Sequence, residues 1–310
     1  MPKIHVNEAI VINDSPENIY NTLSDFHRWQ SWSPWLLAEP DARVDIASKG
    51  DFYEWEGKIV GAGQMQITQT SEKFDFLRID LTFLKPWKSK AKVAFFFEKV
   101  AKGTSVRWTM DSSLPFFLFW MKKSMIAFIS EDYTRGLRLL KDQIETGNTN
   151  SKIVFQGIKK QAAIQYVGFK RYIKSSEIEH YMEKDYSFLM PLYHQKWKTI
   201  KAGPPFTIYH KWDLVNKKVE YTAAVPLTEI PIDLDSKLIV GNLSEMSVYS
   251  VQHEGPYRHI ANAWSAAYMH MRSKRFNALK KAPPMEVYWN SPKDTAELKL
   301  KTEILFPTKD

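Results

Sequence analysis

The first half of the chain opens with the pattern of a strand followed by a short helix. Residues 3–12 predict the strand. Ser15 is a typical helix cap, Pro16 suits the first helical position and Glu17 favours the first turn. The apolar residues that follow recur at helical spacing: Ile19, Tyr20, Leu23 and Phe26. The pattern therefore predicts a helix that ends in the aromatic loop 27–35.

A run of strands occupies the stretch from Arg43 to Met110. Gly, Lys and Pro residues separate its segments, as in the hairpin connections of an antiparallel sheet. The segments predicted as strands are 52–60, 63–70, 74–83, 90–99 and 104–110.

Residues 115–145 predict one long helix. Its apolar stripe consists of Ile126, Ile129, Tyr133, Leu137, Leu140 and Ile144. A curved antiparallel sheet that grips this helix is the simplest arrangement that buries the stripe, so we expect an α+β fold.

The most apolar stretch of the chain, 114–129, overlaps the start of that helix. Lys122 and Lys123 interrupt it, and a bilayer span needs about 20 uninterrupted apolar residues. The stretch therefore does not predict a transmembrane segment. A half-buried helix start is the favoured interpretation, and an interfacial helix that touches a membrane or a hydrophobic ligand is the alternative.

The second half contains an internal repeat. Residues 203–209 (GPPFTIY) are echoed by 282–288 (APPMEVY), and residues 165–173 by 252–260, at offsets of 283 − 204 = 79 and 252 − 165 = 87. Two repeats are too few for a solenoid. They predict a pseudo-two-fold α+β domain of two strand-helix-strand-strand modules, with a groove between its halves that suits a ligand.

The elements of each repeat follow from the same patterns. The first is predicted as a strand near 153–167, a helix near 176–200 and strands at 205–213 and 218–226; the second as a strand at 244–254, a helix near 257–276 and strands at 284–290 and 297–307. A polar, helix-ending segment, 145–151, precedes them. We therefore expect two domains, 1–147 and 152–310.

Composition narrows the class of protein. The 310 residues are 44% hydrophobic and 25% charged, which is typical of a globular protein. The absence of cysteine excludes disulfides, thiolate metal sites and a Cys nucleophile, and it fits a reducing compartment. The first residues lack the apolar segment of a signal peptide. We therefore expect a cytoplasmic protein.

The charge is uneven along the chain. Residues 1–147 hold 19 Lys+Arg and 19 Asp+Glu, whereas residues 148–310 hold 24 and 16, so the whole excess of +8 lies in the second half. The lysines there are scattered, and no nucleic-acid-binding motif accompanies them. We interpret them as solvated surface and expect no nucleic-acid partner.

The first half resembles the polyketide cyclase/START-like helix-grip superfamily. The residues that carry the resemblance are Ser15–Tyr20, Asp25–Trp35, Gly103–Trp108, Asp132–Tyr133, Gly136–Leu137 and Leu140–Lys141. The resemblance covers about residues 3–146 and implies a cavity between sheet and helix that holds an apolar molecule. Trp35, Trp55 and Trp108 are the candidate lining residues; as large aromatics they are also ordinary core material.

The second half resembles the GyrI-like effector-binding domain. The residues that carry this resemblance are Gly203–Pro205 with Tyr209, Val219–Pro226, His253–Tyr257 with Trp264, Pro284–Pro292 and Leu300–Ile304. It covers about residues 152–308 and implies a groove that takes organic, often cationic and aromatic, molecules. The resemblance also implies a groove glutamate on the last strand, a position that Glu303 occupies.

Strand alternation leads to a site hypothesis. Leu298, Leu300, Thr302, Ile304 and Phe306 are predicted to share the face under the helices. Glu303 then points to the opposite face, which we take as the groove. Tyr209 and Tyr288 are equivalent in the two repeats and are expected on its walls, where rings and a carboxylate suit a cation. The alternative for Glu303 is an ordinary strand glutamate paired with Lys299 or Lys301.

The function hypotheses follow. The first is a small-molecule binder with a sensor, carrier or sequestering role, for apolar or cationic aromatic ligands, and it is preferred to an enzyme. The second is a hydrolase of reactive organic compounds in which Glu303 acts as general base beside Tyr288. The third is an interaction module that joins two inert folds. Nucleotide-binding and hydrolase motifs are absent and the histidines have no ligand spacing, so we expect no cofactor and no metal; the oligomeric state is left open.

Overall fold

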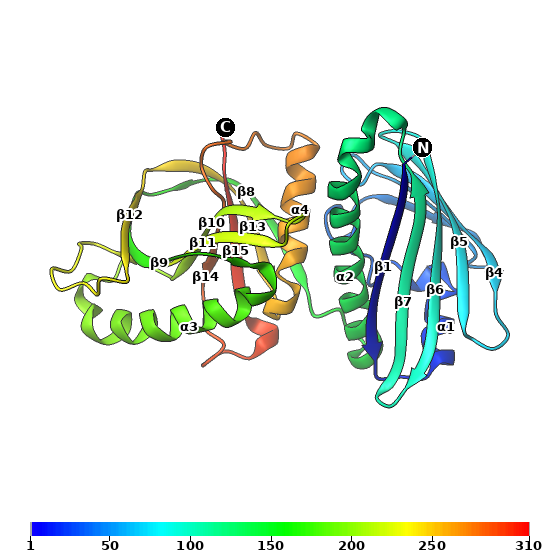
Figure 1. Cartoon of the computed structure of the whole chain (residues 1–310), viewed down its shortest axis with the longest axis horizontal. Helices are drawn as coiled ribbons and strands as arrows, with labels where there is room; N and C mark the ends of the chain where they lie inside the picture. The colour runs from blue at the N-terminus through cyan, green and yellow to red at the C-terminus, as the bar shows by residue number, and fades with distance from the viewer. Residues whose placement is uncertain (1, 310) are drawn as a thin grey trace. The chain divides into compact units, whose positions relative to one another are not determined.

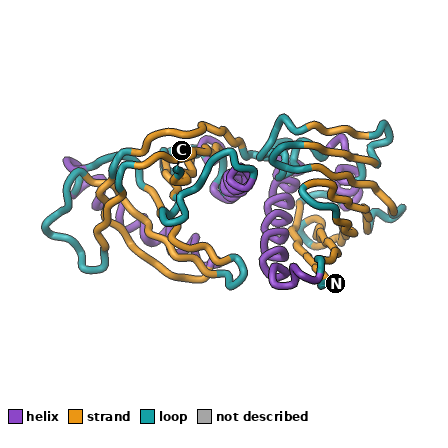
Figure 2. Tube along the Cα trace, turned by 90° about the horizontal axis from the view of Figure 1, so that it is seen from above, coloured by secondary structure: helices purple, strands orange, loops and turns teal. Residues whose placement is uncertain are grey.

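The computed structural model describes residues 2–309, which form two compact units. The first ends at Ser151 and the second begins at Lys152 (Figure 1). Each unit has its own sheet and its own helices (Figure 2).

The first unit is one antiparallel sheet with a long helix. Its strands are β1 (Lys3–Ile12), β2 (Arg43–Ile46), β3 (Phe52–Glu56), β4 (Ala62–Thr70), β5 (Phe76–Lys85), β6 (Ser89–Val100) and β7 (Gly103–Ser113), in the order β1-β7-β6-β5-β4-β3-β2. Its helices are α1 (Pro16–Leu23), the short η1 (Phe26–Arg28) and η2 (Phe116–Met121), and α2 (Lys122–Thr146). The expected helix-grip fold is confirmed.

Helix α2 packs its buried face on the sheet. The ring of Tyr133 stacks on the indole of Trp108 from β7, with 3.9 Å between ring centroids. Gly136 makes this approach possible, because a Cβ built there would lie 2.8 Å from the Trp108 ring. The α-helix begins at residue 122 rather than at 115. Pro115 stands at the N-cap of a 3₁₀ segment, and this segment occupies the six residues Phe116–Met121.

The second unit is an antiparallel sheet of eight strands. They are β8 (Lys152–Gln161), β9 (Ile164–Lys174), β10 (Phe206–Asp213), β11 (Lys218–Leu227), β12 (Ile239–Leu243), β13 (Met246–Glu254), β14 (Met285–Tyr288) and β15 (Lys301–Pro307). Its helical segments are η3 (Ser175–Glu177), α3 (Ile178–Pro191), η4 (Leu192–Lys196), η5 (Lys198–Ile200), η6 (Tyr257–His259), α4 (Ala261–Arg272) and η7 (Glu297–Lys299).

The strand order shows the internal repeat directly. It runs β12-β9-β11-β10-β14-β15-β13-β8, so the modules β9-α3-β10-β11 and β13-α4-β14-β15 meet at the pair β10–β14. Thr207 of the first module lies opposite Glu286 of the second, and these two residues are 79 positions apart, as the sequence repeat is. The predicted pseudo-two-fold arrangement of α+β modules is confirmed.

Two local predictions for this unit were wrong, and a third differs in the type of helix. Residues 153–167 form parts of two strands, because Ala162 and Ala163 turn the chain between β8 and β9. The helix predicted near 176–200 is present, but regular α-helix ends at Pro191 and the short helical segments η4 and η5 carry the chain to Ile200. Leu298 belongs to the 3₁₀ turn η7 and is 56% exposed, so it does not share the buried face of the last strand.

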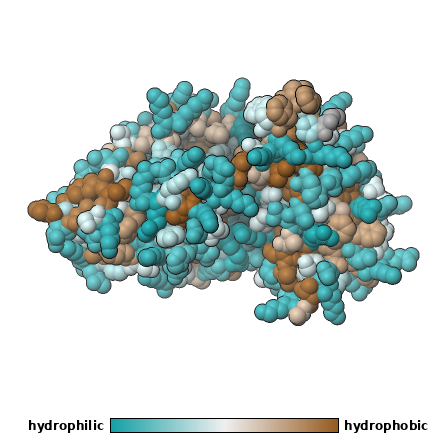
Figure 3. Space-filling model, in the orientation of Figure 1, coloured by the Kyte–Doolittle hydropathy of each residue, from teal (hydrophilic) through white to brown (hydrophobic). Residues whose placement is uncertain are grey.

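Hydrophobic side chains emerge at only a few places on the face of the molecule in Figure 3. In residues 2–309, no helix combines the length and the apolar character that crossing a membrane requires.

Candidate functional site

A buried carboxylate lies at the junction of the two modules. Glu286 comes from the short strand β14 and is 4% exposed. It accepts hydrogen bonds from the Tyr209 hydroxyl at 2.9 Å, the Tyr288 hydroxyl at 2.6 Å and Nε1 of Trp264 at 2.5 Å. All three donors are neutral, so the carboxylate is solvated by dipoles rather than paired with a cation.

Aromatic rings surround this carboxylate. Tyr209 meets Trp264 at 5.2 Å between centroids, and Tyr288 meets Tyr186 and Tyr257 at 5.6 and 5.9 Å. Tyr186 comes from α3 and Trp264 from α4, so both helices cover this face of the sheet.

Burial decides the electrostatics of the cluster. Desolvation raises the pKa of Glu286, against the opposing effect of its three hydrogen bonds. Burial likewise raises the pKa values of Tyr209 and Tyr288, and the nearby carboxylate raises them further. The pKa of Tyr257 rises to about 12, first through burial and then through Glu286. The phenols are therefore donors to Glu286 at neutral pH.

The two modules differ at this point. The hydroxyl of Thr207, the counterpart of Glu286, lies 2.9 Å from the Tyr186 hydroxyl and 3.1 Å from the Tyr288 hydroxyl, whose proton is donated to Glu286. Of these two equivalent positions, the one on the second module therefore carries the carboxylate.

Glu303 lies on the other face of the sheet. Its register partner is Val287, whereas Glu286 is paired with Ile304, and successive residues of a strand point to opposite faces. Glu303 is 2% exposed; it bonds to Lys159 and Ser250 and accepts from Nε1 of Trp289 at 3.0 Å. The carboxylate is thus already paired with an ammonium group.

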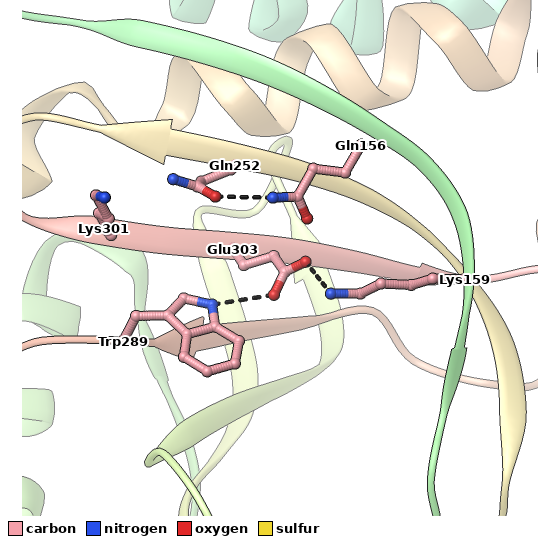
Figure 4. A pocket seen from close by; sticks show the side chains of 6 residues that line it. All are labelled: Gln156, Lys159, Gln252, Trp289, Lys301 and Glu303. Atoms are coloured by element: carbon pink, nitrogen blue, oxygen red, sulfur yellow. Dashed lines mark hydrogen bonds and ion pairs between the residues drawn. The ribbon is translucent and has the colours of Figure 1, made fainter.

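A pocket of about 350 Å³ opens beside Glu303. It is lined by Gln156, Lys159, Gln252, Trp289, Lys301 and Glu303. Figure 4 shows Glu303 between Trp289 and Lys159, with the two glutamine amides joined by a hydrogen bond of 2.8 Å. The lining is polar apart from the indole.

The expected grouping of Glu303 with Tyr209 and Tyr288 is wrong. Both tyrosines bond to Glu286 under the helices, and Tyr288 lies opposite Thr302, on the face that Glu303 avoids. Side-chain alternation in the last strand correctly predicts Glu303 on the face away from the helices, but the prediction that the two tyrosines share that face is wrong. Because Glu303 and Tyr288 lie on opposite faces of the sheet, they cannot act together as the predicted catalytic pair.

Sequence reasoning missed Glu286 itself. Two signals point to it: Glu286 shares a face with Tyr288, two residues later, and the repeat offset aligns it with Thr207 beside Tyr209. Lys159 and Trp289 carried no comparable signal, because strand pairing brings them to Glu303: β8 with β13 and β13 with β15 for Lys159, and β14 with β15 for Trp289.

The three candidate tryptophans of the first unit belong to one hydrophobic core, but they have different ring contacts. Trp35 meets Trp108 edge-on at 6.0 Å, and Trp108, at 2% exposed, also stacks on Phe95 and Tyr133. Trp55 is half-buried and contacts Tyr53 and Phe83 instead. Trp108 is therefore a core residue in this structure, whereas Trp35 and Trp55 lie at the core's edge.

Family models match both units. The model for "Polyketide cyclase / dehydrase and lipid transport" matches residues 3–145, and the model for "GyrI-like small molecule binding domain" matches residues 157–309. The chain joins a polyketide cyclase-like domain to a GyrI-like domain. The two resemblances found in the sequence are confirmed, and the GyrI-like domain is a small-molecule-binding domain by its family.

Solved structures are similar to parts of the chain. EcmrR in a cryo-EM complex with DNA is 15% identical, with a TM-score of 0.41 over 60% of this chain and 67% of that one. SAV2435 bound to tetraphenylphosphonium is 17% identical, with a TM-score of 0.39 over 50% and 94%. The Aha1 dimer from Colwellia psychrerythraea is 21% identical, with a TM-score of 0.36 over 46% and 98%. Among curated proteins, no sequence matches this chain.

Within residues 2–309, no three His, Asp or Glu side chains of the two domains gather closely enough to hold a metal ion. The side chains available for binding or catalysis at the two carboxylate sites are carboxylates, phenols, indoles and lysines.

Proposed function

We propose that the GyrI-like domain binds cationic aromatic molecules with Glu286 as the counter-ion. The observation that carries the proposal is the buried carboxylate held by three neutral donors inside a shell of aromatic rings. A bound cation interacts with the full negative charge of Glu286, because the three groups that donate hydrogen bonds to the carboxylate are neutral and no cation has to be displaced. The rings of Tyr209, Tyr288 and Trp264 add cation–π attraction.

Entry of a ligand requires α3 and α4 to move away from the sheet. Glu286 is 4% exposed beneath Tyr186 of α3 and Trp264 of α4. The hydroxyl of Tyr186 is tied to Thr207 and the indole of Trp264 to Glu286, so these are the contacts that a ligand replaces. Loss of these contacts on binding is part of the proposal.

Glu303 is the weaker candidate for a cation. Lys159 already neutralises it, so a cationic ligand has to compete with an intramolecular ammonium group. We keep Glu303 as a proposed ligand contact in the pocket of Figure 4, where Trp289 offers a half-exposed indole for stacking.

The polyketide cyclase-like domain is proposed to take an apolar molecule. Trp35 and Trp55, at the edge of the core, are the residues proposed to touch it, and Trp108 forms the floor beneath Trp35. With two ligand-binding folds in one chain, we propose a carrier or sequestering role, or a sensor acting through a partner. The lack of cysteine makes the cytoplasm the proposed compartment.

The deciding experiment is a calorimetric titration with tetraphenylphosphonium and with the neutral triphenylphosphine oxide. Glu286→Gln should weaken binding of the cation by about 1.5–3 kcal/mol, or roughly 10- to 150-fold, because a charge-assisted contact is lost. Binding of the neutral compound should change little. Glu245→Gln, at an exposed position of the same domain between β12 and β13, is the matched control. Unchanged cation affinity in Glu286→Gln would contradict the assignment.

Hydrolysis of a reactive organic compound is the second candidate. The raised pKa of Glu286 and the adjacent phenols of Tyr209 and Tyr288 suit general acid–base catalysis. This candidate transfers the proposed role from Glu303 to Glu286. A hydrolase loses turnover in Glu286→Gln but keeps much of its ground-state binding, whereas a binder loses affinity.

A further inference from the structure

A short 3₁₀ segment of the polyketide cyclase-like domain displays four aromatic side chains to solvent. In η2 (Phe116–Met121), Phe116 is 75% exposed, Phe117 73%, Phe119 60% and Trp120 68%. Isolated exposed apolar residues are ordinary, but a contiguous group of large ones marks an interaction surface. Figure 3 shows a hydrophobic cluster projecting at the upper right, where η2 lies in Figure 1.

The geometry of the 3₁₀ helix explains how the segment is held while its aromatics face outwards. With three residues per turn, positions three apart share a face. Phe116 and Phe119 form one face, with 6.1 Å between their rings, and Phe117 and Trp120 form the next. The third face carries Leu118, which packs against the core of the domain. The segment is thus anchored on one side and apolar on the other two.

A second exposed aromatic belongs to the same end of the sheet. Trp87, 52% exposed, lies in the turn between β5 and β6. The hydroxyl of Ser112, near the end of β7, bonds to the carbonyl of Lys90 at the start of β6. This contact fixes the β5–β6 turn beside the point where the chain enters η2. Two separate stretches of sequence therefore bring indoles and phenyl rings to one end of the domain.

Lysines predominate in the two stretches that carry these aromatics, although one of them, Lys85, is paired with Glu56. Residues 85–90 contain three lysines and residues 116–123 contain two, and neither stretch contains an acidic residue. Lys88, Lys122 and Lys123 are exposed. Aromatic rings flanked by lysines are complementary to the boundary of an anionic bilayer, where rings enter the headgroup region and ammonium groups meet lipid phosphates.

We propose that this end of the domain, formed by Trp87, η2 and the flanking lysines, docks on the surface of an anionic lipid bilayer. The segment lies on the membrane and does not cross it, because six residues of 3₁₀ helix are far shorter than the hydrocarbon core. The lysines argue for this occupant over a second copy of the chain, since two copies meeting at this end would bring like charges together.

Sedimentation of the full-length protein with vesicles tests the proposal. One set contains phosphatidylcholine alone and the other also contains phosphatidylglycerol. We expect binding to the anionic vesicles that falls with added salt. Lys122→Gln with Lys123→Gln should weaken it roughly 30-fold, at about fivefold per lysine. Phe117→Ala with Trp120→Ala should weaken it at least about tenfold through lost apolar burial.

Matched controls use exposed residues elsewhere. Lys73→Gln lies in the turn between β4 and β5, at the opposite end of the same sheet, and Trp212→Ala removes a 45% exposed indole of the GyrI-like domain. Both should bind the vesicles as the unaltered protein does. Quenching of tryptophan emission by brominated lipid should fall in Trp120→Phe but not in Trp212→Phe.

Three outcomes overturn the proposal. The first is no binding to either vesicle, and the second is equal binding to neutral and anionic vesicles. The third is a dimer in analytical ultracentrifugation that Phe117→Ala with Trp120→Ala abolishes, which assigns the surface to a second copy. Circular dichroism of each variant shows whether it is folded. Titration with tetraphenylphosphonium should be unchanged in the variants of Phe117, Trp120, Lys122 and Lys123, so failure here leaves the proposal for Glu286 standing.

Discussion

The hydroxyl of Tyr209 lies 2.9 Å from Oε2 of Glu286, although 77 positions separate the two residues. Tyr209 belongs to the first module of the GyrI-like domain and Glu286 to the second. Their bond crosses the β10–β14 pair on which the pseudo-symmetry is centred. The carboxylate proposed to receive a cation is therefore held by residues of both modules.

Loss of one phenol should destabilise the domain. Tyr209→Phe or Tyr288→Phe removes a donor from a carboxylate that is 4% exposed, and a bond to a charged group contributes about 1.5–3 kcal/mol. Urea denaturation at neutral pH should show a loss of this size. Tyr172→Phe, at a 58% exposed position, should be close to neutral. Equal effects at all three positions would show that the hydrogen bonds to Glu286 contribute no more to the free energy of unfolding than an exposed phenol does.

The raised pKa of Glu286 has a consequence for stability. The pKa of Glu286 in the folded protein lies above its ordinary value of 4.5. The protonated carboxyl group therefore contributes its full stabilisation below pH 4.5. This stabilisation is lost as the pH rises through the folded-state pKa. Glu286→Gln mimics the protonated form. The variant should therefore gain stability relative to the parent protein as the pH rises above 4.5. A difference that stays constant with pH would contradict the shift.

Ligand binding should depend on pH in the opposite sense. The cation binds the ionised carboxylate, so affinity for tetraphenylphosphonium should rise as Glu286 loses its proton above its raised pKa. Affinity for triphenylphosphine oxide should stay flat over the same range. Calorimetric titrations of both compounds at a series of pH values make this measurement.

Removal of Lys159 should separate the two carboxylate sites. Lys159→Met leaves Glu303 buried without its cation, which should cost about 1–3 kcal/mol, less than a fully buried pair because the lysine is 38% exposed. Combination with Glu303→Gln should recover most of the loss. Lys159→Met should also let the pocket of Figure 4 take a cation. A second, weaker binding event that disappears in the double variant would confirm Glu303 as a ligand contact.

Trp108 should behave as a core residue. Trp108→Ala removes a 2% exposed indole stacked on Phe95 and Tyr133, and such truncations cost about 3–5 kcal/mol. Trp87→Ala, at an exposed position, should change stability by less than about 0.5 kcal/mol. Circular dichroism during chemical denaturation follows both without relying on tryptophan emission. A mild effect of Trp108→Ala would indicate a spacious cavity instead of a packed core.

The two folds could be predicted from the spacing of residues along the chain. The helical stripe through Tyr133, Leu137 and Leu140 specified that one face of α2 must be buried, and the repeat at an offset of 79 specified two modules. These features follow from local periodicity, which depends only on the spacing of apolar residues along one element. Alternation in the last strand likewise placed Glu303 on the face away from the helices.

Tertiary structure decided which residues meet. The face on which Tyr209 and Tyr288 lie depends on how β10 pairs with β14 and on which side α3 and α4 pack, and neither is encoded in the spacing within one strand. The partners of Glu303 come from β8, from β13 and from the residue after β14, brought together by the pairing of distant strands. A side chain's periodicity fixes its face, but its charge partner and its burial, and hence the raised pKa of Glu286, arise only when separate elements close around it.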